Sequence, residues 1–273
     1  MEKEEKISIL QEIVRINSVN GNEREVAEYL KQLLSKYGIE GKMVSYSDGR
    51  DNLVASFENG YQKKVLGLSG HMDVVSAGDE SAWIYPPFAA EIHENRLYGR
   101  GTTDMKSGLA AMVIAMIELK ESGQTFNGTV KLLATVGEEI GELGSEQLTK
   151  EGYVDDLDGL IIGEPTNYNL MYAHMGSINY TVISHGKEAH SSMPQKGYNA
   201  INHLNEFITR VNEKLNRIAE EFQNPVLGQP IHNITVISGE IRSIVSQVKH
   251  VFKEIFARFQ IFQMRKRLFC YKK

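Results

Sequence analysis

The chain has 273 residues, 41% of them hydrophobic and 24% charged, so it is long enough for one large domain or two ordinary ones with a sizeable core. Its formal net charge of −5 argues against a dedicated nucleic-acid-binding protein, which normally carries a basic face. The single cysteine, Cys270, excludes an internal disulfide, and we see neither a signal core nor a membrane-spanning apolar run, so we expect a cytoplasmic protein.

Two helices are predicted at the beginning of the chain. Apolar residues recur at helical spacing between Ile7 and Ile16. A second helix is predicted from about Glu23 to Tyr37, where Gly38 occupies the position that commonly follows a helix end.

Strands and helices alternate after these helices. We predict strands at residues 53–57 and 64–70, a strand–turn–strand at 88–101, a helix at 106–121, and strands at 128–139 and 157–165. This alternation is typical of an α/β domain with a mostly parallel sheet.

The pattern changes near residue 175. Residues 177–186 alternate like a half-exposed antiparallel strand, a long helix is predicted at 199–222, and 232–239 again resembles a strand. We therefore expect a first domain at 1–175 and a smaller α+β domain at 176–238, with a tail at 239–273.

Acids or a histidine follow four of the segments of the first domain. They are His71 and Asp73, Asp104, Glu138 and Glu139, and Glu164. Because ligands gather at the carboxyl ends of the strands in an α/β sheet, we expect these loops to lie side by side. Several carboxylates in one cleft need a compensating charge, and a mixture of histidine and carboxylates suits zinc and similar divalent cations.

Each feature also has a structural interpretation. A lone His-x-Asp pair is more often structural, Asp104 could cap the following helix, and Glu164 before Pro165 could belong to a turn. The run GRGTTD lacks the spacing of a phosphate-binding loop. We expect Lys106 to be solvated or to begin a helix, with support of Asp104 as the alternative.

Taken together, the motifs GHMDVV, GRGTTDMKSG, GEE, GEPT and GKEAHSSMP resemble the dinuclear zinc deacylase and metallopeptidase family. This family includes succinyl-diaminopimelate desuccinylase, acetylornithine deacetylase, aminoacylase and glutamate carboxypeptidase. The resemblance covers residues 1 to about 238. It implies a zinc-peptidase-like catalytic domain with a ferredoxin-like lid and dimerisation domain, and two Zn²⁺ ions per complete active site, with Co²⁺ as a possible substitute.

The resemblance also implies a role for each motif residue. His71 and Glu164 would bind one metal, Glu139 the other, and Asp104 both. Asp73 would orient the imidazole of His71. The other implied roles are general base for Glu138, oxyanion donor for His190 and substrate contact for Asn233, and a cis bond is expected between Asp104 and Met105.

The tail departs from the family pattern. Nothing after residue 238 matches, and codons allowed for residues 240–266 can be chosen so that a one-nucleotide shift restores a family-like continuation. We therefore expect a frameshifted tail, an incomplete lid and a missing last metal ligand. Such a chain would bind metal weakly and hydrolyse slowly.

The first functional hypothesis is hydrolysis of N-succinyl-diaminopimelate, a step of lysine and cell-wall precursor synthesis. Acetylornithine deacetylase or a dipeptidase is the alternative within the same class, and a truncated, non-catalytic remnant is the alternative of another class. The expected partner is a small N-acyl amino acid, with no nucleic acid and no membrane. A homodimer is expected only for a complete lid.

Overall fold

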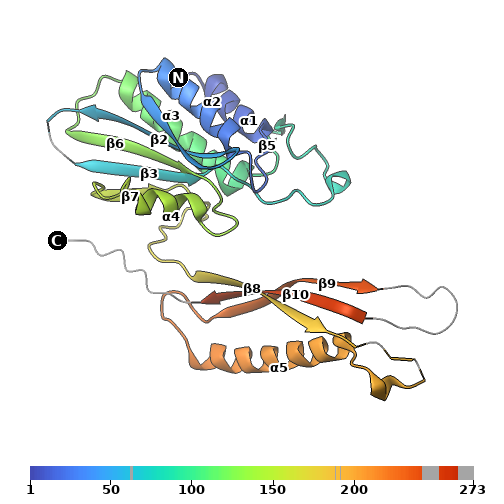
Figure 1. Cartoon of the computed structure of the whole chain (residues 1–273). Helices are drawn as coiled ribbons and strands as arrows, with labels where there is room; N and C mark the ends of the chain where they lie inside the picture. The colour runs from blue at the N-terminus through green and yellow to red at the C-terminus, as the bar shows by residue number, and fades with distance from the viewer. Residues whose placement is uncertain (62–63, 188, 191, 242–251, 264–273) are drawn as a thin grey trace. The chain divides into compact units, whose positions relative to one another are not determined.

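The structure is a computed structural model, and it describes residues 1–61, 64–187, 189–190, 192–241 and 252–263. It divides into two compact units, Met1–Tyr168 and Asn169–Lys273 (Figure 1). The division falls seven residues before the predicted boundary at 175, while the first strand of the second unit begins at Gly176 as the sequence analysis expects. Among the described residues, no helix has the length and apolarity that crossing a membrane requires.

Unit 1, Met1–Tyr168, is built on a five-stranded sheet. The strands are β1 (Glu40–Ser47), β2 (Arg50–Asn59), β3 (Val65–His71), β6 (Gly128–Thr135) and β7 (Gly159–Ile162), in the order β1-β2-β6-β3-β7. β2 pairs antiparallel with both β1 and β6, whereas β3 pairs parallel with β6 and β7. Four of these five strands therefore run in one direction, which confirms the predicted α/β fold with a mostly parallel sheet.

Helices cover both faces of this sheet (Figure 1). On one face lie α1 (Lys3–Arg15), α2 (Glu23–Lys36) and α3 (Ser107–Glu121), whose apolar residues form the main core with β2, β3 and β6. On the other face, Leu148 of α4 (Leu143–Lys150) packs in a smaller cluster with Val44 and Leu133. The burial of both faces explains the consecutive apolar residues in β3 (VLGL) and β6 (LLA).

The segment between β3 and α3 forms an excursion from the sheet. It contains the short turn η1 (Glu80–Ala82), the hairpin of β4 (Glu91–His93) and β5 (Arg96–Tyr98), and the irregular turn η2 (Thr102–Lys106). Glu94 and Asn95 both have positive φ angles, as a tight two-residue hairpin requires. The predicted strand–turn–strand is therefore present.

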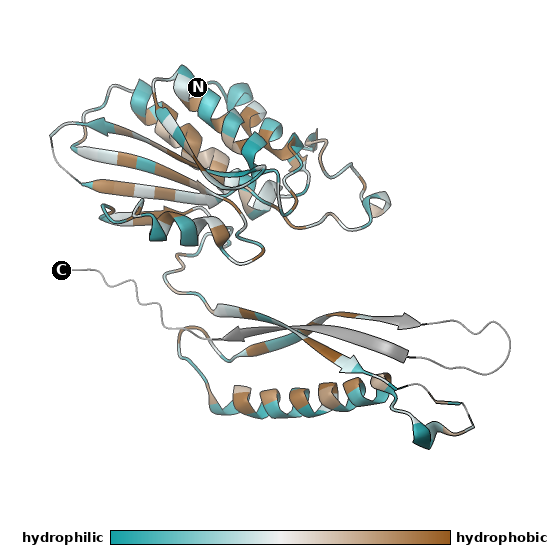
Figure 2. Ribbon diagram, in the orientation of Figure 1, coloured by the Kyte–Doolittle hydropathy of each residue, from teal (hydrophilic) through white to brown (hydrophobic). Residues whose placement is uncertain are grey.

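Unit 2 contains β8 (Gly176–His185), η3 (Pro194–Lys196), α5 (Ala200–Glu221), β9 (Ile231–Ile241) and β10 (Phe252–Gln263). The sheet order is β8-β10-β9, and both pairings are antiparallel. Apolar residues recur along α5 (Figure 2), and Ala200 and Leu204 are buried against a cluster that includes Tyr180 and Ile234 of the sheet. The predicted strand–helix–strand unit is present.

Part of the predicted aberrant tail, residues 239–273, belongs to described strands. Residues 239–241 extend β9, and β10 occupies the centre of the sheet. The sequence of β10, FKEIFARFQIFQ, is rich in phenylalanine and isoleucine, which favour strands. Residues 242–251 and 264–273 of the predicted aberrant tail lie outside the described residues.

Candidate metal centre

His71 is the last residue of β3 and lies at the centre of the charged cluster. Its side chain is buried, with 1% of its surface exposed. Its Nε2 lies 3.1 Å from a carboxylate oxygen of Asp104, 3.5 Å from one of Glu164 and 4.0 Å from one of Glu138. One imidazole nitrogen is thus surrounded by three acids that are distant in sequence.

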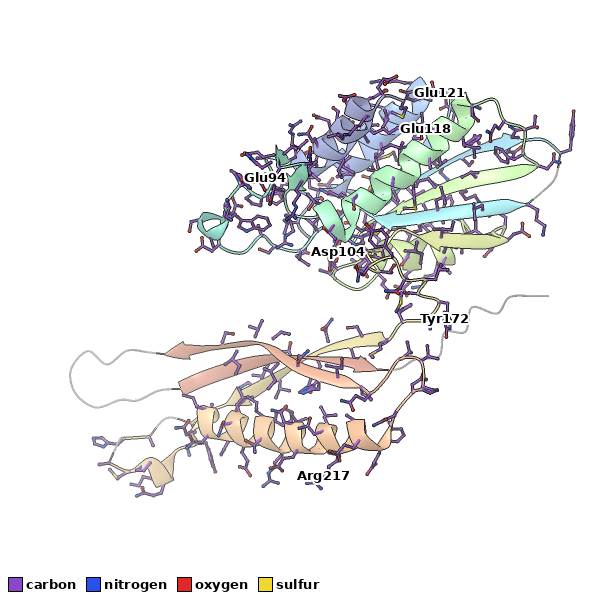
Figure 3. The ribbon with its side chains drawn as sticks, turned by 180° about the vertical axis from the view of Figure 1, so that it is seen from behind. Glu94, Asp104, Glu118, Glu121, Tyr172 and Arg217 are labelled. Carbon is purple, nitrogen blue, oxygen red and sulfur yellow. The ribbon has the colours of Figure 1, made fainter. Side chains whose placement is uncertain are left out.

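The sheet explains why these acids meet. His71 pairs with Thr135 in the parallel β3–β6 ladder, and Ser69 pairs with Ile162 in the β3–β7 ladder. The carboxyl ends of β3, β6 and β7 therefore lie at one edge, and the loops after them carry the predicted residues. Figure 3 shows Asp104 where α3 begins.

Two sets of potential ligands share His71. One contains Glu138 and Glu139, the other Asp104 and Glu164, and within each set the ligand atoms lie within 4.8 Å of one another. The structure thus brings together all five predicted metal and base residues. The two sets overlap at His71, whereas the resemblance implies Asp104 as the shared ligand, so the assignment of each residue to a metal stays a prediction.

A close backbone approach positions Glu164 near Asp104. A Cβ atom on Gly108, in the first turn of α3, would lie 2.0 Å from the carbonyl oxygen of Gly163. Only glycine allows this contact, which places the loop after β7 against the start of α3. The Asp104–Met105 peptide bond is cis, as predicted.

Asp73 lies on the other side of the His71 ring and is fully buried. The Nδ1 of His71 is 2.9 Å from the backbone carbonyl oxygen of Asp73 and 3.5 Å from its carboxylate. The carboxylate itself accepts the backbone N–H groups of Glu138 (3.1 Å) and Glu139 (3.2 Å). Asp73 therefore contacts both the imidazole and the loop that bears two further acids.

The pKa values show that the acids repel one another. Burial and the neighbouring carboxylates raise the pKa of Glu139 and of Glu164 to about 7, against the attraction of His71. Burial also raises the pKa of Glu138. For His71, burial lowers the pKa, but hydrogen bonds to Asp104 and Asp73 outweigh it and raise the pKa to about 11.

These properties fit a divalent cation. The donor set is one imidazole and four carboxylates, which suits zinc and similar metals. Acids that raise one another's pKa are stabilised in their charged form by a bound cation, because the cation replaces repulsion with attraction. The imidazole of His71 could therefore bind a metal ion in place of a proton, with the surrounding carboxylates as further ligands.

Lys106 differs from its expected solvated position. It is fully buried, and its Nζ donates to the carbonyl oxygens of Ile13 (2.7 Å) and Ile16 (2.8 Å) at the end of α1. Burial lowers its pKa to about 7, against an opposing effect of Asp73. Sequence reasoning missed this because the partners are backbone carbonyls of a helix ninety residues away.

The two remaining predicted residues lie in unit 2. His190 is exposed, and its Nδ1 accepts the backbone N–H of Ser192 at 3.1 Å. Asn233 is exposed on β9, opposite Gln260 of β10. Because the two units are described separately, the roles of both residues stay predictions.

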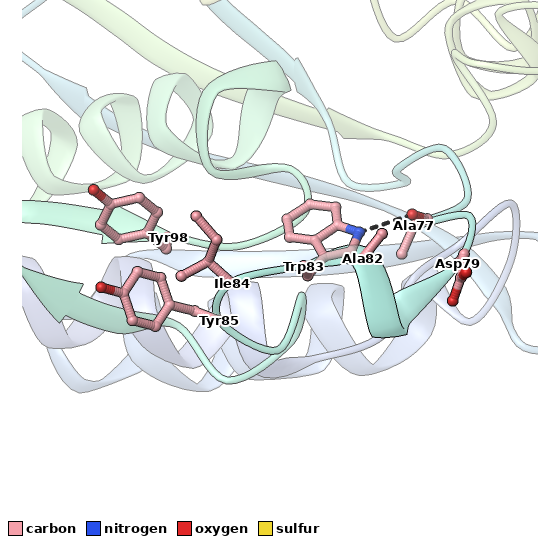
Figure 4. A pocket seen from close by; sticks show the side chains of 7 residues that line it. All are labelled: Ala77, Asp79, Ala82, Trp83, Ile84, Tyr85 and Tyr98. Carbon is pink, nitrogen blue, oxygen red and sulfur yellow. Dashed lines mark hydrogen bonds between the residues drawn. The ribbon is translucent and has the colours of Figure 1, made fainter.

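A cavity of about 420 Å³ lies elsewhere in unit 1 (Figure 4). Its lining is mostly aromatic and apolar and consists of Ala77, Asp79, Ala82, Trp83, Ile84, Tyr85 and Tyr98. The indole N–H of Trp83 donates to the carbonyl of Ala77, and the carboxylate of Asp79 accepts from Ser81. None of the clustered acids lines this cavity, so the cavity is not part of the candidate metal centre.

Comparison with known proteins agrees with this geometry. Peptidase family M20/M25/M40 matches residues 67–237. A protein of Staphylococcus epidermidis named "Probable succinyl-diaminopimelate desuccinylase" is 50% identical over 220 residues, which cover 81% of this chain and 54% of that protein. The chain thus spans about half the length of the curated relatives it matches.

Solved structures show the same fold. The metallo-carboxypeptidase Sso-CP2 of Sulfolobus solfataricus, described as an M20 family member, superposes with a TM-score of 0.78 at 20% identity, over 98% of this chain and 72% of that one. The YXEP protein of Bacillus subtilis, described as a dinuclear metal-binding peptidase, gives a TM-score of 0.58 at 11% identity, over 96% of this chain and 65% of that one.

Proposed function

The chain belongs to peptidase family M20/M25/M40, and we propose that its site serves metal-dependent hydrolysis of the amide bond of an N-acyl amino acid. The observation that carries this proposal is the cluster of four carboxylates from three loops around the buried imidazole of His71. Carboxylates gathered this closely around one imidazole repel one another unless a cation binds among them, and amide hydrolysis is a reaction that such cations assist.

We propose that His71, Asp104, Glu139 and Glu164 hold two zinc ions, with cobalt as a functional substitute. Supporting this proposal, His71, Asp104 and Glu164 form one set of potential ligands, and Glu139 lies with Glu138 in a second set around the same imidazole. When bound, the metal ions supply positive charge that polarises the scissile carbonyl and lowers the pKa of water.

Glu138 is the proposed general base. Burial raises its pKa, so its carboxylate accepts a proton more readily than an exposed glutamate does. In the proposed reaction it takes a proton from the attacking water and passes it to the leaving amine nitrogen. The bond from its backbone N–H to Asp73 holds the residue in place, and its carboxylate lies 4.0 Å from Nε2 of His71.

N-succinyl-diaminopimelate is the first proposed substrate. The names of relatives at about half identity support it, as does the presence of the motif residues in this chain. Acetylornithine and dipeptides are the alternative substrates. The roles of His190 as oxyanion donor and Asn233 as substrate contact, the cytoplasmic location and a homodimer remain proposals that rest on the family resemblance.

The test is release of free amine from N-succinyl-diaminopimelate, N-acetylornithine and a dipeptide, each with and without added Zn²⁺ or Co²⁺. We expect metal-dependent release from the succinyl substrate, and Glu138→Gln should lower kcat by about 10²- to 10⁴-fold because it removes the proton acceptor. A chain that binds metal but releases no amine from any substrate would instead support the non-catalytic remnant.

A further inference from the structure

The loop after β6 places two adjacent glutamates close to one imidazole. Glu138 and Glu139 are consecutive, yet both have a carboxylate oxygen within 4.8 Å of a ligand nitrogen of His71. In an extended strand, consecutive side chains point to opposite sides. The backbone must therefore turn here, and Gly137 begins the turn with a φ of +62°.

Four consecutive backbone N–H groups of this loop donate to side-chain oxygens. The N–H of Val136 donates to Asn52 (3.0 Å) and that of Gly137 to Glu23 (3.2 Å). The next two N–H groups donate to the carboxylate of Asp73. The N–H groups of the turn are thus bound by side chains of three other segments, while the carbonyl groups of residues 136–138 accept from backbone N–H groups of residues 141–144.

Glu23 is the most unexpected of these acceptors. It is the first residue of α2, and its side chain is fully buried. Its charge is balanced by Arg50 of β2, whose Nε lies 2.9 Å and 3.2 Å from the two carboxylate oxygens and whose Nη2 donates to the same oxygen as Gly137. Only 14% of the Arg50 side chain is exposed.

We propose that Glu23, held in place by Arg50, is a positioning residue that fixes the loop bearing Glu138 and Glu139. This inference rests on the proposed function of that loop but concerns residues outside the metal and base set. Glu23 contacts none of the clustered carboxylates or His71 directly. It acts through the N–H of Gly137, the second residue after the end of β6.

Arg50 also limits what can occupy position 137. A Cβ atom there would lie 2.9 Å from Nη2 of Arg50 and 2.8 Å from Leu143. Glycine is therefore favoured by the left-handed φ, and any other residue would also displace the ends of the Arg50 and Leu143 side chains.

The molecule offers a matched control. Arg24 and Asp51 form a second ion pair between α2 and β2, one residue along from Glu23 and Arg50 in each element. Asp51 is also buried, with 7% of its side chain exposed, but none of its hydrogen bonds given by the structure reaches residues 136–139. Replacing either acid removes one ion pair between α2 and β2. Of the two acids, only Glu23 contacts the loop that bears Glu138 and Glu139.

The first measurement is backbone hydrogen exchange in the metal-free full-length chain, read by mass spectrometry on peptides that contain residues 136–139. We expect Glu23→Ala to speed exchange of this segment about tenfold, because an N–H loses a charged acceptor. Asp51→Ala should leave the segment at the wild-type rate. This readout does not depend on metal or activity.

The second measurement is Co²⁺ affinity, followed by the visible absorption of the bound ion. Glu23→Ala should weaken binding about 10- to 100-fold, as for other residues that orient ligands, and Asp51→Ala should not. Equal effects of the two variants, or unchanged exchange and affinity in Glu23→Ala, would overturn the proposal. A wild-type chain that binds no Co²⁺ would refute the proposed function, while the exchange result would still decide the role of Glu23.

A conservative pair covers the case in which Glu23→Ala does not fold. Glu23→Gln keeps an oxygen that can accept from Gly137 but loses the charge that holds Arg50, whereas Asp51→Asn makes the same change in the control pair. Faster exchange at residues 136–139 in Glu23→Gln than in Asp51→Asn supports the proposal. Equal exchange in the two variants contradicts it.

Discussion

The Asp73 carboxylate connects two parts of the candidate metal centre. It is fully buried near the ring of His71 and accepts both N–H groups of the loop that presents Glu138 and Glu139. Burial alone would raise its pKa, but the hydrogen bonds from His71 and from the two N–H groups lower it. The carboxylate therefore stays charged, and its two oxygens serve different donors.

Replacement of Asp73 by asparagine tests this arrangement. An amide has one acceptor oxygen and one donor nitrogen, so one of the two N–H groups would face another donor. We expect Asp73→Asn to weaken Co²⁺ binding about 10- to 100-fold and to lower the free energy of unfolding by about 1–3 kcal/mol. Titration calorimetry and urea unfolding measure these effects. Asp79→Asn, at an exposed capping residue, is the control, and equal results for the two variants would contradict the account.

The ligand side chains could be predicted from sequence, but the residues that hold them could not. His71, Asp104 and Glu164 each follow or border an apolar segment, and their motifs are specific together. The sequence gives no indication that Glu23 and Lys106 are buried, because a charged residue at the start of a helix is normally expected to be exposed to solvent. Their burial depends on how α1, α2 and the β6 loop pack in three dimensions.

Helix α1 is tied to the candidate site by Lys106. The last carbonyl groups of a helix have no partner within the helix, and the Lys106 ammonium satisfies those of Ile13 and Ile16. A cation at the C-terminus of a helix is also favoured by the helix dipole. The position of α1 thereby helps to hold the turn η2, which contains Asp104.

Replacement of Lys106 by methionine should therefore affect α1. The methionine keeps an apolar stem but leaves two buried carbonyl groups without a donor, and we expect a loss of about 1–3 kcal/mol in the free energy of unfolding. Urea unfolding gives the loss, and hydrogen exchange of the α1 peptides should accelerate. Lys36→Met, in the exposed last turn of α2, serves as the control. Stability at or above that of wild type would show that the buried ammonium does not support α1.

Elements with a strong apolar pattern were predicted well, and two elements with a weak pattern were missed. The helices at 106–121 and 199–222 agree with α3 and α5 to within one residue at each end. Strand β1 was not predicted because its polar residues interrupt the apolar pattern, and α4 was not because it is short and contains only two leucines as apolar residues. β10 lies in the segment where the family resemblance ends, and its pairing depends on β8 and β9.

Unit 1 contains the whole charged cluster within residues 71–164. The three strands that carry its loops lie in one sheet with helices on both faces, so the ligand positions depend on the core of that unit. Unit 2 has its own sheet and a helix packed on it. Metal binding can therefore be examined as a property of unit 1 in the full chain, apart from the proposed roles of His190 and Asn233.

The central claim is that His71 and the surrounding acids form a metal centre, and metal retention tests it most directly. Zinc content would be measured by mass spectrometry after dialysis of the wild type, His71→Ala and His93→Ala at equal free zinc. His93 is the control, since its partner is Glu91 of the same hairpin. At a free zinc concentration high enough for the weak binding expected of an incomplete ligand set, the account predicts equal zinc content in the wild type and His93→Ala and a loss of zinc in His71→Ala. A wild type without zinc, or His71→Ala with the wild-type content, would contradict it.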